Sequence, residues 1–332
     1  MTYLDKPQRG FVLGKFMPPH LGHVYLCDFA RHYVDTLTIL VCSLPSDPIP
    51  GALRLAWMRE MFPRARVLHC EEALPQAPED DPENFWAIWR DVVKRHHPEP
   101  LDIVFASETY GRRLAAEAGA RFVPVDIGRT TFPVSGTAVR ADPYGHWALL
   151  PAPVRRHYLK RVTLFGAEST GKTTLAKLLA KRFDTVVAPE FGRFHTETFG
   201  SGATSAEDIR QIVAGHLAGV QAVRPYANRV LIEDTDPVLT AIWSDALCGS
   251  RDPWFAAYRD YPDLYLLCDV DMPWVNDGTR YFADTEVRRR FQEACERELV
   301  ARGVRFVRIE GSNEQRLADA IAAIEVLFDP ET

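Results

Sequence analysis

The chain has 332 residues, which suits two domains of about 150 residues, each large enough for its own apolar core. Hydrophobic residues make up 46% and charged residues 25%, as in ordinary globular proteins, and the net charge of −6 disfavours a general attraction to nucleic acid or to an anionic membrane. No apolar run approaches the ~18 residues of a membrane-spanning helix and no signal peptide opens the chain, so we expect a cytoplasmic protein.

The first half of the chain alternates strand-like and helical segments. This alternation predicts an α/β domain with a parallel sheet, helices on both faces, and nucleotide bound across the carboxyl ends of the strands. The predicted strands are 10–13, 37–42, 65–68, 101–105 and 121–125, and the predicted helices lie near 22–33, 52–61, 83–96 and 109–117.

A loop between the first predicted strand and the first helix has the composition of an anion site. It reads Gly14-Lys15-Phe16-Met17-Pro18-Pro19-His20-Leu21-Gly22-His23. A glycine turn after a buried strand brings phosphate to a helix N-terminus, where free N–H groups and the helix dipole favour negative charge. His20 and His23 would share one helix face and donate hydrogen bonds to a phosphate whose charge rises during substitution.

The second half opens with a phosphate-binding loop. An apolar strand at 161–165 runs into Gly166-x-x-x-x-Gly171-Lys172-Thr173 and then into a helical pattern. In such loops backbone N–H groups surround the phosphates, the lysine reaches the β and γ phosphates, and the hydroxyl ligates Mg²⁺. Further strands are predicted at 185–188, 229–233, 264–268 and 304–309, and the proline-bounded stretch 143–155 reads as the domain junction.

The cysteines and the basic runs indicate no further chemistry. The six cysteines are dispersed, with no Cys-x-x-Cys and no clustering with histidines at metal spacing, so we expect buried, reduced thiols. The basic runs 155–161 and 288–290 are more typical of solvated or nucleotide-facing surfaces than of DNA binding, and for 288–290 we expect a solvated helix face.

These motifs carry a family resemblance. The loop at 14–23, with Val134 to Arg140 about 110 residues later, resembles the nicotinamide mononucleotide adenylyltransferases of the nucleotidyltransferase superfamily. Fused to a P-loop half, the chain resembles the NadR family, which joins that transferase to a ribosylnicotinamide kinase. The resemblance implies a Rossmann-like nucleotidyltransferase domain at 1–155 and a P-loop kinase domain at 156–332, both with parallel sheets. Further matching segments are 86–89, 107–108, 190–193, 234–236 and 273–280.

In the transferase half, the resemblance implies that His20 and His23 stabilise charge while the mononucleotide attacks the α-phosphorus of ATP. Ser135 and Arg140 also fit an ordinary helix cap with a surface arginine. Trp86 is the better candidate to stack on nicotinamide, although two tryptophans at this spacing are typical of a core. Gly51 and Ala52 replace an Asp-Arg pair that is common in relatives. The implied ATP ligands are Gly14, Lys15, Phe16, His20, His23, Ser135, Thr137 and Arg140, and the implied mononucleotide ligands are Trp86, Trp89 and Arg54.

In the kinase half, the resemblance implies that Lys172 binds phosphate, Glu190 acts as general base, and Arg280 in a lid at 273–280 stabilises the transferring phosphoryl group. Thr173 and Asp234 would hold Mg²⁺. A helix cap is the alternative for an acid in the 234–236 loop, and Phe194 stands where relatives commonly have an acid. The implied ATP ligands are Gly166, Glu168, Ser169, Thr170, Gly171, Lys172, Thr173 and Thr174, and the implied riboside ligands are Glu190, Arg193, Asp236 and Trp274.

The function that this resemblance implies is bifunctional. ATP would phosphorylate nicotinamide riboside to nicotinamide mononucleotide (NMN), and a second ATP would adenylylate NMN to NAD. The alternatives are adenylylation of another phosphate, such as phosphopantetheine or flavin mononucleotide, and an NAD or ATP sensor with one weakened site. About nine residues precede the first strand, so we expect no helix-turn-helix module. The competence of both sites, feedback by NAD, transfer of NMN between the sites and the oligomeric state, for which a homo-oligomer is compatible, stay open.

Overall fold

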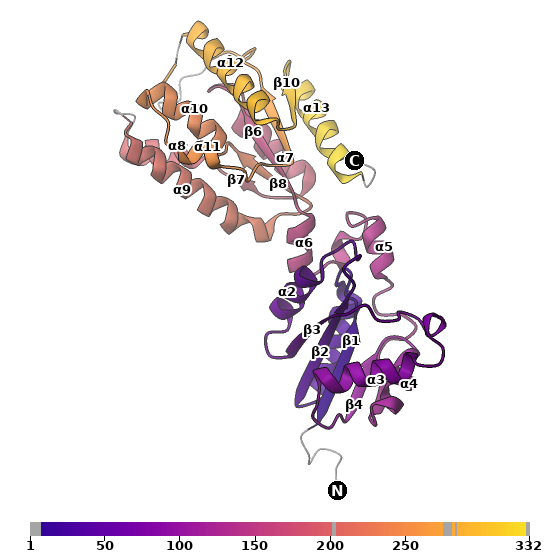
Figure 1. The fold of residues 1–332 in the computed structure, drawn as a ribbon. Coiled ribbons are helices and arrows are strands. Elements are labelled where there is room, and N and C mark those ends of the chain that lie inside the picture. The colour runs from indigo at the N-terminus through magenta and orange to yellow at the C-terminus, as the bar shows by residue number, and fades with distance from the viewer. Residues whose placement is uncertain (1–7, 201–203, 275–280, 283, 330–332) are drawn as a thin grey trace. The chain divides into compact units, whose positions relative to one another are not determined.

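The computed structural model of the protein describes residues 8–200, 204–274, 281–282 and 284–329. The chain divides into two compact units, with the boundary between His157 and Tyr158, two residues beyond the predicted junction (Figure 1). Each unit contains one five-stranded parallel sheet. The predicted α/β class with two parallel sheets is therefore confirmed.

The N-terminal unit has the strand order β3-β2-β1-β4-β5, in which the chain moves outward in both directions from β1. This order places the turn after β1 at the point where the winding reverses, which is where doubly wound folds bind nucleotides. The strands are β1 (Arg9–Gly14), β2 (Thr36–Ser43), β3 (Arg66–Glu71), β4 (Ile103–Ala106) and β5 (Arg121–Pro124), and the helices are α1 (Leu21–Tyr33), α2 (Gly51–Met61), α3 (Phe85–His96), α4 (Tyr110–Glu117), α5 (Gly136–Ala141) and α6 (Ala152–Tyr158).

Successive residues of β1 build two apolar cores on opposite faces of this sheet. Val12 packs in the core that receives Leu26 from α1 and Met58 from α2. Phe11 packs in the other core, with Trp89 from α3 and further residues from α4. Side chains alternate between the faces of a strand, so a strand buried on both faces is continuously apolar, as the segment 11–13 is.

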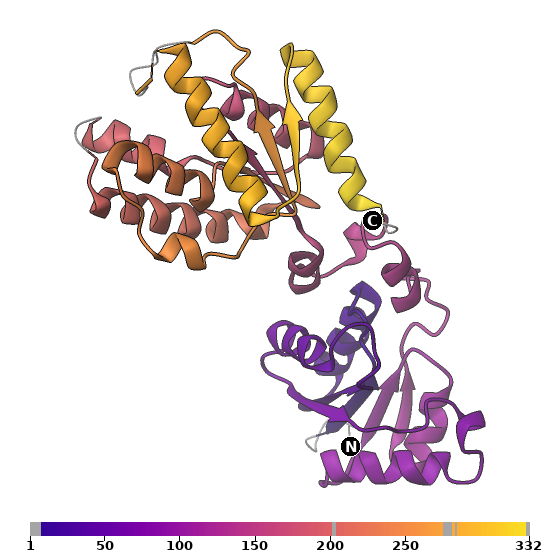
Figure 2. The ribbon, with the colours of Figure 1, turned by 45° about the horizontal axis from the view of Figure 1, so that its top comes forward.

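The C-terminal unit repeats the architecture with the order β10-β9-β6-β8-β7. In Figure 2 the neighbouring orange and yellow strands of this unit are β9 and β10. Its P-loop strand β6 lies at the centre, between β9 and β8. The strands are β6 (Lys160–Phe165), β7 (Val187–Ala188), β8 (Val230–Asp234), β9 (Leu264–Cys268) and β10 (Phe306–Ile309), and the helices are α7 (Lys172–Phe183), α8 (Phe191–Phe199), α9 (Ala206–Val223), α10 (Pro237–Cys248), α11 (Trp254–Ala257), α12 (Thr285–Arg302) and α13 (Asn313–Glu325).

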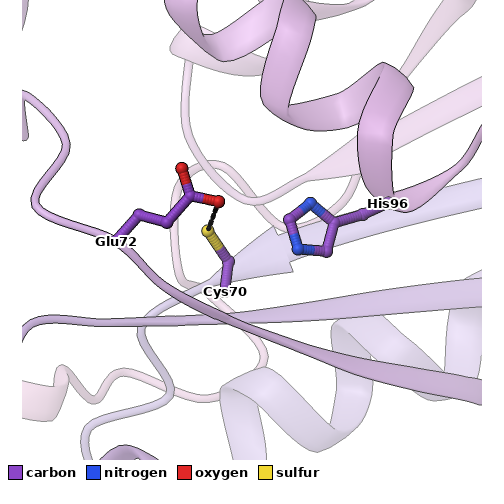
Figure 3. Close-up of side chains that lie close together, drawn as sticks. All are labelled: Cys70, Glu72 and His96. Carbon is purple, nitrogen blue, oxygen red and sulfur yellow. Dashed lines mark hydrogen bonds between the residues drawn. The ribbon is translucent and has the colours of Figure 1, made fainter.

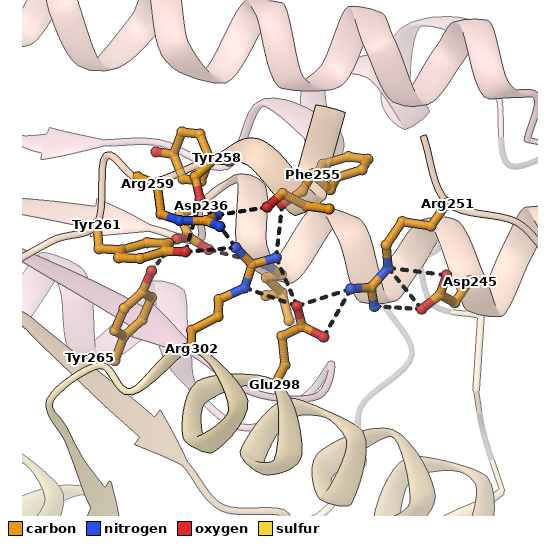
Figure 4. A network of polar contacts seen from close by, with 12 residues as sticks. Asp236, Asp245, Arg251, Phe255, Tyr258, Arg259, Tyr261, Tyr265, Glu298 and Arg302 are labelled. Carbon is orange, nitrogen blue, oxygen red and sulfur yellow. Dashed lines mark hydrogen bonds and ion pairs between the residues drawn. The ribbon is translucent and has the colours of Figure 1, made fainter. Parts of the chain in front are cut away.

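A polar network braces the side of the second unit formed by α10, α11 and α12 (Figure 4). Arg302 of α12 donates to the carbonyl of Phe255 and pairs with Glu298, which in turn pairs with Arg251. Arg251 also pairs with Asp245 on α10. Several shared charges fix one another's geometry, so this network ties the three helices together better than separate surface pairs would.

Among the described helices, none is both long enough and apolar enough to cross a bilayer.

A buried histidine makes the second unit sensitive to acid. His216 of α9 is buried, neither ring nitrogen has a hydrogen-bond partner within the described chain, and burial together with nearby Arg161 lowers its pKa from 6.5 to about 4. The unfolded chain therefore binds this proton at higher pH than the folded chain does. His216 has no effect on the pH dependence of the unfolding free energy above pH 6.5, and it lowers this free energy progressively as the pH falls toward 4. At one pKa unit per 1.36 kcal/mol, the loss is about 3 kcal/mol.

We expect His216→Phe to reduce the fall in unfolding free energy between pH 7 and pH 4. Urea melts of wild type and variant at both pH values measure it. An equal fall in the two proteins would contradict this account.

Candidate active sites

A cavity of ≈ 820 Å³ opens beside the 14–23 loop of the N-terminal unit. Loop residues, α3 and the start of α5 line it together with the segments after β4 and β5. Ten of the eleven residues predicted for this half line the cavity: Gly14, Lys15, Phe16, His20, His23, Trp86, Trp89, Ser135, Thr137 and Arg140.

The two loop histidines stack on each other inside this cavity. Their ring centroids lie 3.8 Å apart with 30° between the planes. Burial, with the positive charge of Arg129 nearby, lowers the pKa of His20 to about 4, and burial, His20 and Arg129 hold the pKa of His23 well below its usual value. Both rings are therefore neutral at pH 7 before a phosphate arrives. The backbone N–H of His20 donates to Nδ1 of His23 (3.4 Å), which leaves the proton of a neutral His23 on Nε2.

The segment 134–140 closes against the loop. Ser135 caps α5 by accepting from the N–H of Ala138 (3.1 Å), and Arg140 donates to the carbonyl of Met17 and to the hydroxyl of Thr137. A Cβ on Gly136 would lie 2.8 Å from the same Met17 oxygen, so only glycine allows this approach. Ser135 therefore does two things: its side chain caps the start of α5, and the residue also lines the cavity.

The tryptophans of α3 differ in their surroundings. Trp89 is buried in the core and its indole N–H donates to the carbonyl of Pro75 (3.1 Å). Trp86 is half-buried. Its ring is nearly perpendicular to that of Phe85, and the Arg113 guanidinium lies 6.0 Å from its ring centroid. Trp86 is therefore the better placed of the two to offer a ring face to a ligand.

Arg54 lies beneath the loop, outside the lining of the cavity. Its side chain is fully buried, pairs with Asp47 (2.6 Å), and donates to the carbonyls of Lys15 (2.6 Å) and Cys42 (3.3 Å). It is absent from the cavity lining. The guanidinium is enclosed beneath the loop and positions its backbone, so the mononucleotide contact stays a prediction.

Sequence reasoning missed Arg129. This residue lines the cavity, pairs with Glu108 (3.0 Å) and lowers the pKa of both histidines. It belongs to an irregular loop after β5 that has no phosphate motif, so only the fold brings it to the histidines.

A second cavity, of ≈ 470 Å³, lies over the P-loop of the C-terminal unit. The backbone of the loop is open to an anion because Gly171 (φ 78°) and Ser169 (φ 56°) adopt left-handed conformations. Lys172 begins α7, and its Nζ donates to the carbonyls of Gly166 (2.9 Å) and Ala167 (2.6 Å). Nine predicted residues line this cavity: Glu168, Ser169, Thr170, Gly171, Lys172, Thr173, Thr174, Glu190 and Arg193.

Asp234 ends β8 directly beside the P-loop strand, paired in register with Leu164. The residue is buried, and its Oδ1 has no hydrogen-bond partner in the described parts of the chain. An orphaned carboxylate oxygen next to the P-loop, with the hydroxyl of Thr173 in the cavity wall, fits the oxygen ligands that Mg²⁺ prefers. The next residue, Thr235, lines the cavity with φ 82°, a strained value for a β-branched residue.

Glu190 and Arg193 face the other wall of the same cavity. Glu190 is the N-cap of α8, and one of its oxygens lies 3.7 Å from the Arg193 guanidinium. Phe194, which replaces the acid common in relatives, is 47% exposed and is not part of the lining.

Asp236 is a helix cap. It is buried, its Oδ1 accepts from the N–H of Leu239 (3.0 Å), and its Oδ2 accepts from the hydroxyl of Tyr265 (2.7 Å) (Figure 4). Burial raises its pKa to about 7. The helix cap is therefore observed, and the riboside contact stays a prediction, since Asp236 does not line the cavity.

The predicted lid falls partly outside the described residues. Arg280 lies there, and Trp274 does not line the cavity. Instead, Glu168 of the P-loop accepts from the indole of Trp274 (3.4 Å) and from the backbone N–H groups of Tyr281 (2.9 Å) and Phe282 (2.7 Å). Glu168 therefore holds both described ends of this segment against the P-loop.

The run 288–290 is only partly the expected solvated face. Arg289 and Arg290 are exposed and pair with Glu286. Arg288 is 2% exposed and donates to the carbonyl of Ser169 (3.3 Å), so it supports the P-loop.

Aromatic residues that the sequence did not single out also line this cavity. Trp243 of α10 and Tyr281 lie with ring centroids 5.8 Å apart, and Phe199 lies at the end of α8. His195 and Asp208, 3.5 Å apart, complete the wall between α8 and α9. From the sequence alone these aromatic residues are typical of a core, because no local pattern distinguishes a core aromatic residue from one that lines a cavity.

Together, the folds and sites define a nucleotide-binding protein with two separate phosphate-loop sites, one in each unit. Two family models match these units: the cytidylyltransferase-like family over residues 11–127 and an AAA domain over residues 161–316.

Comparison with known proteins identifies the family. The chain is 30% identical over 329 residues to the trifunctional NAD biosynthesis/regulator protein NadR of Escherichia coli (strain K12), covering 92% of this chain and 80% of that protein. It therefore belongs to the NadR family, as the motifs predicted. The nicotinamide-nucleotide adenylyltransferase of Pyrobaculum neutrophilum is 31% identical over 120 residues, covering 34% of this chain and 64% of that enzyme.

Solved structures support the fold. A NadR protein in complex with NAD and AMP-PNP superposes with a TM-score of 0.74 at 23% identity, covering 97% of this chain and 96% of the other. A NadR protein in complex with NR superposes with a TM-score of 0.73 at 21% identity, covering 98% of each chain.

Proposed function

We propose that the protein is a bifunctional enzyme of NAD salvage. Its P-loop half transfers the γ-phosphoryl group of ATP to nicotinamide riboside, and its N-terminal half joins the resulting NMN to the adenylyl group of a second ATP. The observation that carries this proposal is the presence of two separate cavities, each lined by its own phosphate-binding loop. Membership of the NadR family supports the choice of substrates.

In the kinase half, Lys172 and the P-loop N–H groups hold the β and γ phosphates. Glu190 takes the proton of the riboside 5′-hydroxyl as its oxygen attacks the γ-phosphorus and ADP leaves. Mg²⁺, when bound, neutralises charge on the β and γ phosphates, and Thr173 and Asp234 are the residues that would hold it. Arg193, close to Glu190 on the cavity wall, faces the same substrate.

In the transferase half, a phosphate oxygen of NMN attacks the α-phosphorus of ATP and pyrophosphate leaves. No covalent enzyme intermediate is required, so catalysis consists of positioning and charge stabilisation. His23 donates from Nε2, the buried ring of His20 stacks beside it, and Arg129 and Arg140 supply positive charge at the cavity wall. Trp86 offers a ring face to the cationic pyridinium.

The test follows both products from one reaction. Purified protein receives nicotinamide riboside, ATP and Mg²⁺, and mass-resolved chromatography follows NMN and NAD. We expect NMN to appear first and NAD to follow. NMN without NAD would refute the transferase half, and NAD from added NMN but none from riboside would refute the kinase half. Tight nucleotide binding without either product would favour a sensor.

Trp243 is our candidate for the riboside ring. With Tyr281 beside it in the cavity wall, its indole face suits a pyridinium cation, a contact of about 1–2 kcal/mol. We therefore expect Trp243→Leu to raise the KM for riboside about tenfold, while Trp243→Phe, which keeps an aromatic face, changes it less. Steady-state kinetics with riboside varied, and the KM for ATP as the internal control, measure this. If both variants kept the wild-type KM for riboside, Trp243 would have no contact with the riboside.

A further inference from the structure

Three side chains of the kinds that bind metals lie close together at the end of β3. None of them belongs to either phosphate-binding loop. Cys70 belongs to β3, Glu72 follows directly after this strand, and His96 is the last residue of α3. One potential ligand atom from each lies within 4.8 Å of the others, and the Cys70 thiol is 3.7 Å from Oε1 of Glu72 (Figure 3). The sequence did not reveal this cluster, because 23 residues separate Glu72 from His96 along the chain.

Each of the two polar ligands is already oriented by a second residue. Nδ1 of His96 lies 2.9 Å from the carbonyl of Val92, and since a carbonyl only accepts, Nδ1 carries the proton and Nε2 has a free lone pair. Arg95 donates to Oε2 of Glu72 (2.8 Å), which leaves Oε1 on the side of Cys70. Metal-binding histidines and carboxylates are typically held in this way by a carbonyl or a charged partner.

The donor set selects the kind of ion. One sulfur, one imidazole nitrogen and one carboxylate oxygen suit a borderline-soft divalent cation, and they are poor ligands for Mg²⁺, which prefers oxygen alone. A tetrahedral zinc site places its ligand atoms about 3.3–3.8 Å apart, given Zn–S and Zn–N bonds of about 2.3 and 2.0 Å. Side-chain rotations close the remaining distance, because Glu72 and His96 are only half-buried.

We propose that Cys70, Glu72 and His96 form a site for Zn²⁺ in the N-terminal unit. On binding, the Cys70 thiol gives its proton to the solvent and its sulfur forms a bond to the ion. The fourth position is taken by water. Cys42 lies directly across from Cys70 in the register of β2 and β3, and it lines the transferase cavity, so the proposed ion lies next to that site.

Cobalt provides a direct readout of the sulfur ligand. The reduced, EDTA-treated full chain is titrated with Co²⁺ in buffer without nucleotide or phosphate, and near-ultraviolet absorption reports thiolate-to-cobalt charge transfer. We expect one equivalent of Co²⁺ to produce this band and one equivalent of Zn²⁺ to abolish it. Cys70→Ser and His96→Gln should eliminate stoichiometric binding, and Arg95→Gln should weaken it about tenfold.

Cys248→Ser is the matched thiol control, since Cys248 is a partly exposed cysteine of the other unit. Its band should equal that of the wild type. Circular dichroism establishes that each variant is folded. Absence of a band in the wild type, a band that survives in Cys70→Ser, or a band that disappears in Cys248→Ser would overturn the proposal.

Discussion

Lys172→Ala is expected to lower the rate of riboside phosphorylation about a thousandfold while conversion of NMN to NAD continues at the wild-type rate. The Nζ of Lys172 is held by the carbonyls of Gly166 and Ala167, inside the loop that surrounds the phosphates. The cavity of the N-terminal unit, to which we assign adenylyl transfer, is lined only by residues of that unit, so it does not depend on this lysine. The two activities, assayed separately from riboside and from NMN, measure the effect.

Lys181→Ala is the matched control, because Lys181 is an exposed lysine of the same helix and is not in the cavity lining. It should retain both activities. Loss of both activities in a folded Lys172→Ala protein would contradict the model of two independent sites.

His20→Ala should have the reverse effect. The imidazole of His20 lies in the N-terminal cavity, stacked 3.8 Å from the ring of His23. Removing one preorganised group at a centre of developing charge costs about 10²–10³ in rate, so we expect kcat/KM for NAD formation from NMN to fall by that factor. Phosphorylation of riboside should be unchanged.

Two further variants make this test specific. His20 is the N-cap of α1, so His20→Asn, which places a favoured capping residue there, separates loss of chemistry from loss of the helix end. His32→Ala removes an exposed histidine of the same helix and should be silent. If His20→Asn and His20→Ala both formed NAD at the wild-type rate, His20 would have no role in the transfer.

Secondary structure followed closely from hydrophobic periodicity. All ten strands of the described residues lie where apolar runs predicted them. The largest shift of a boundary is at β3, predicted over 65–68 and observed as Arg66–Glu71, and the strand most shortened relative to its prediction is β7, predicted over 185–188 and observed as Val187–Ala188. This strand lies at the edge of its sheet and pairs with β8 alone, so only a short stretch gains ladder hydrogen bonds. A central strand such as β6 is easier to predict from the sequence, because both of its faces are buried and its residues form a nearly continuous apolar run.

Three charged residues of the motif segments turn inward for a shared physical reason. Arg54, Asp236 and Arg288 are charged side chains in motif-bearing segments, and in each case the charge turns inward to satisfy backbone groups or a buried partner. Burying a charge is costly unless it is paired, so a position next to a ligand loop is as suitable for bracing the loop as for contacting the ligand. A sequence motif does not distinguish a residue that supports the loop from one that contacts the ligand, since the direction of a side chain depends on packing.

The sequence alone determined both phosphate loops, the parallel α/β architecture and the family. These features are local: a glycine turn, the strand before it and the helix after it are contiguous, and their conformation follows from a few neighbouring residues. Tertiary structure alone decided that Arg129 lies beside His20, that Trp243 and Tyr281 share a cavity wall, and that Cys70, Glu72 and His96 meet. Such groupings join segments far apart in the chain, and they depend on strand order and helix packing, which no local pattern encodes.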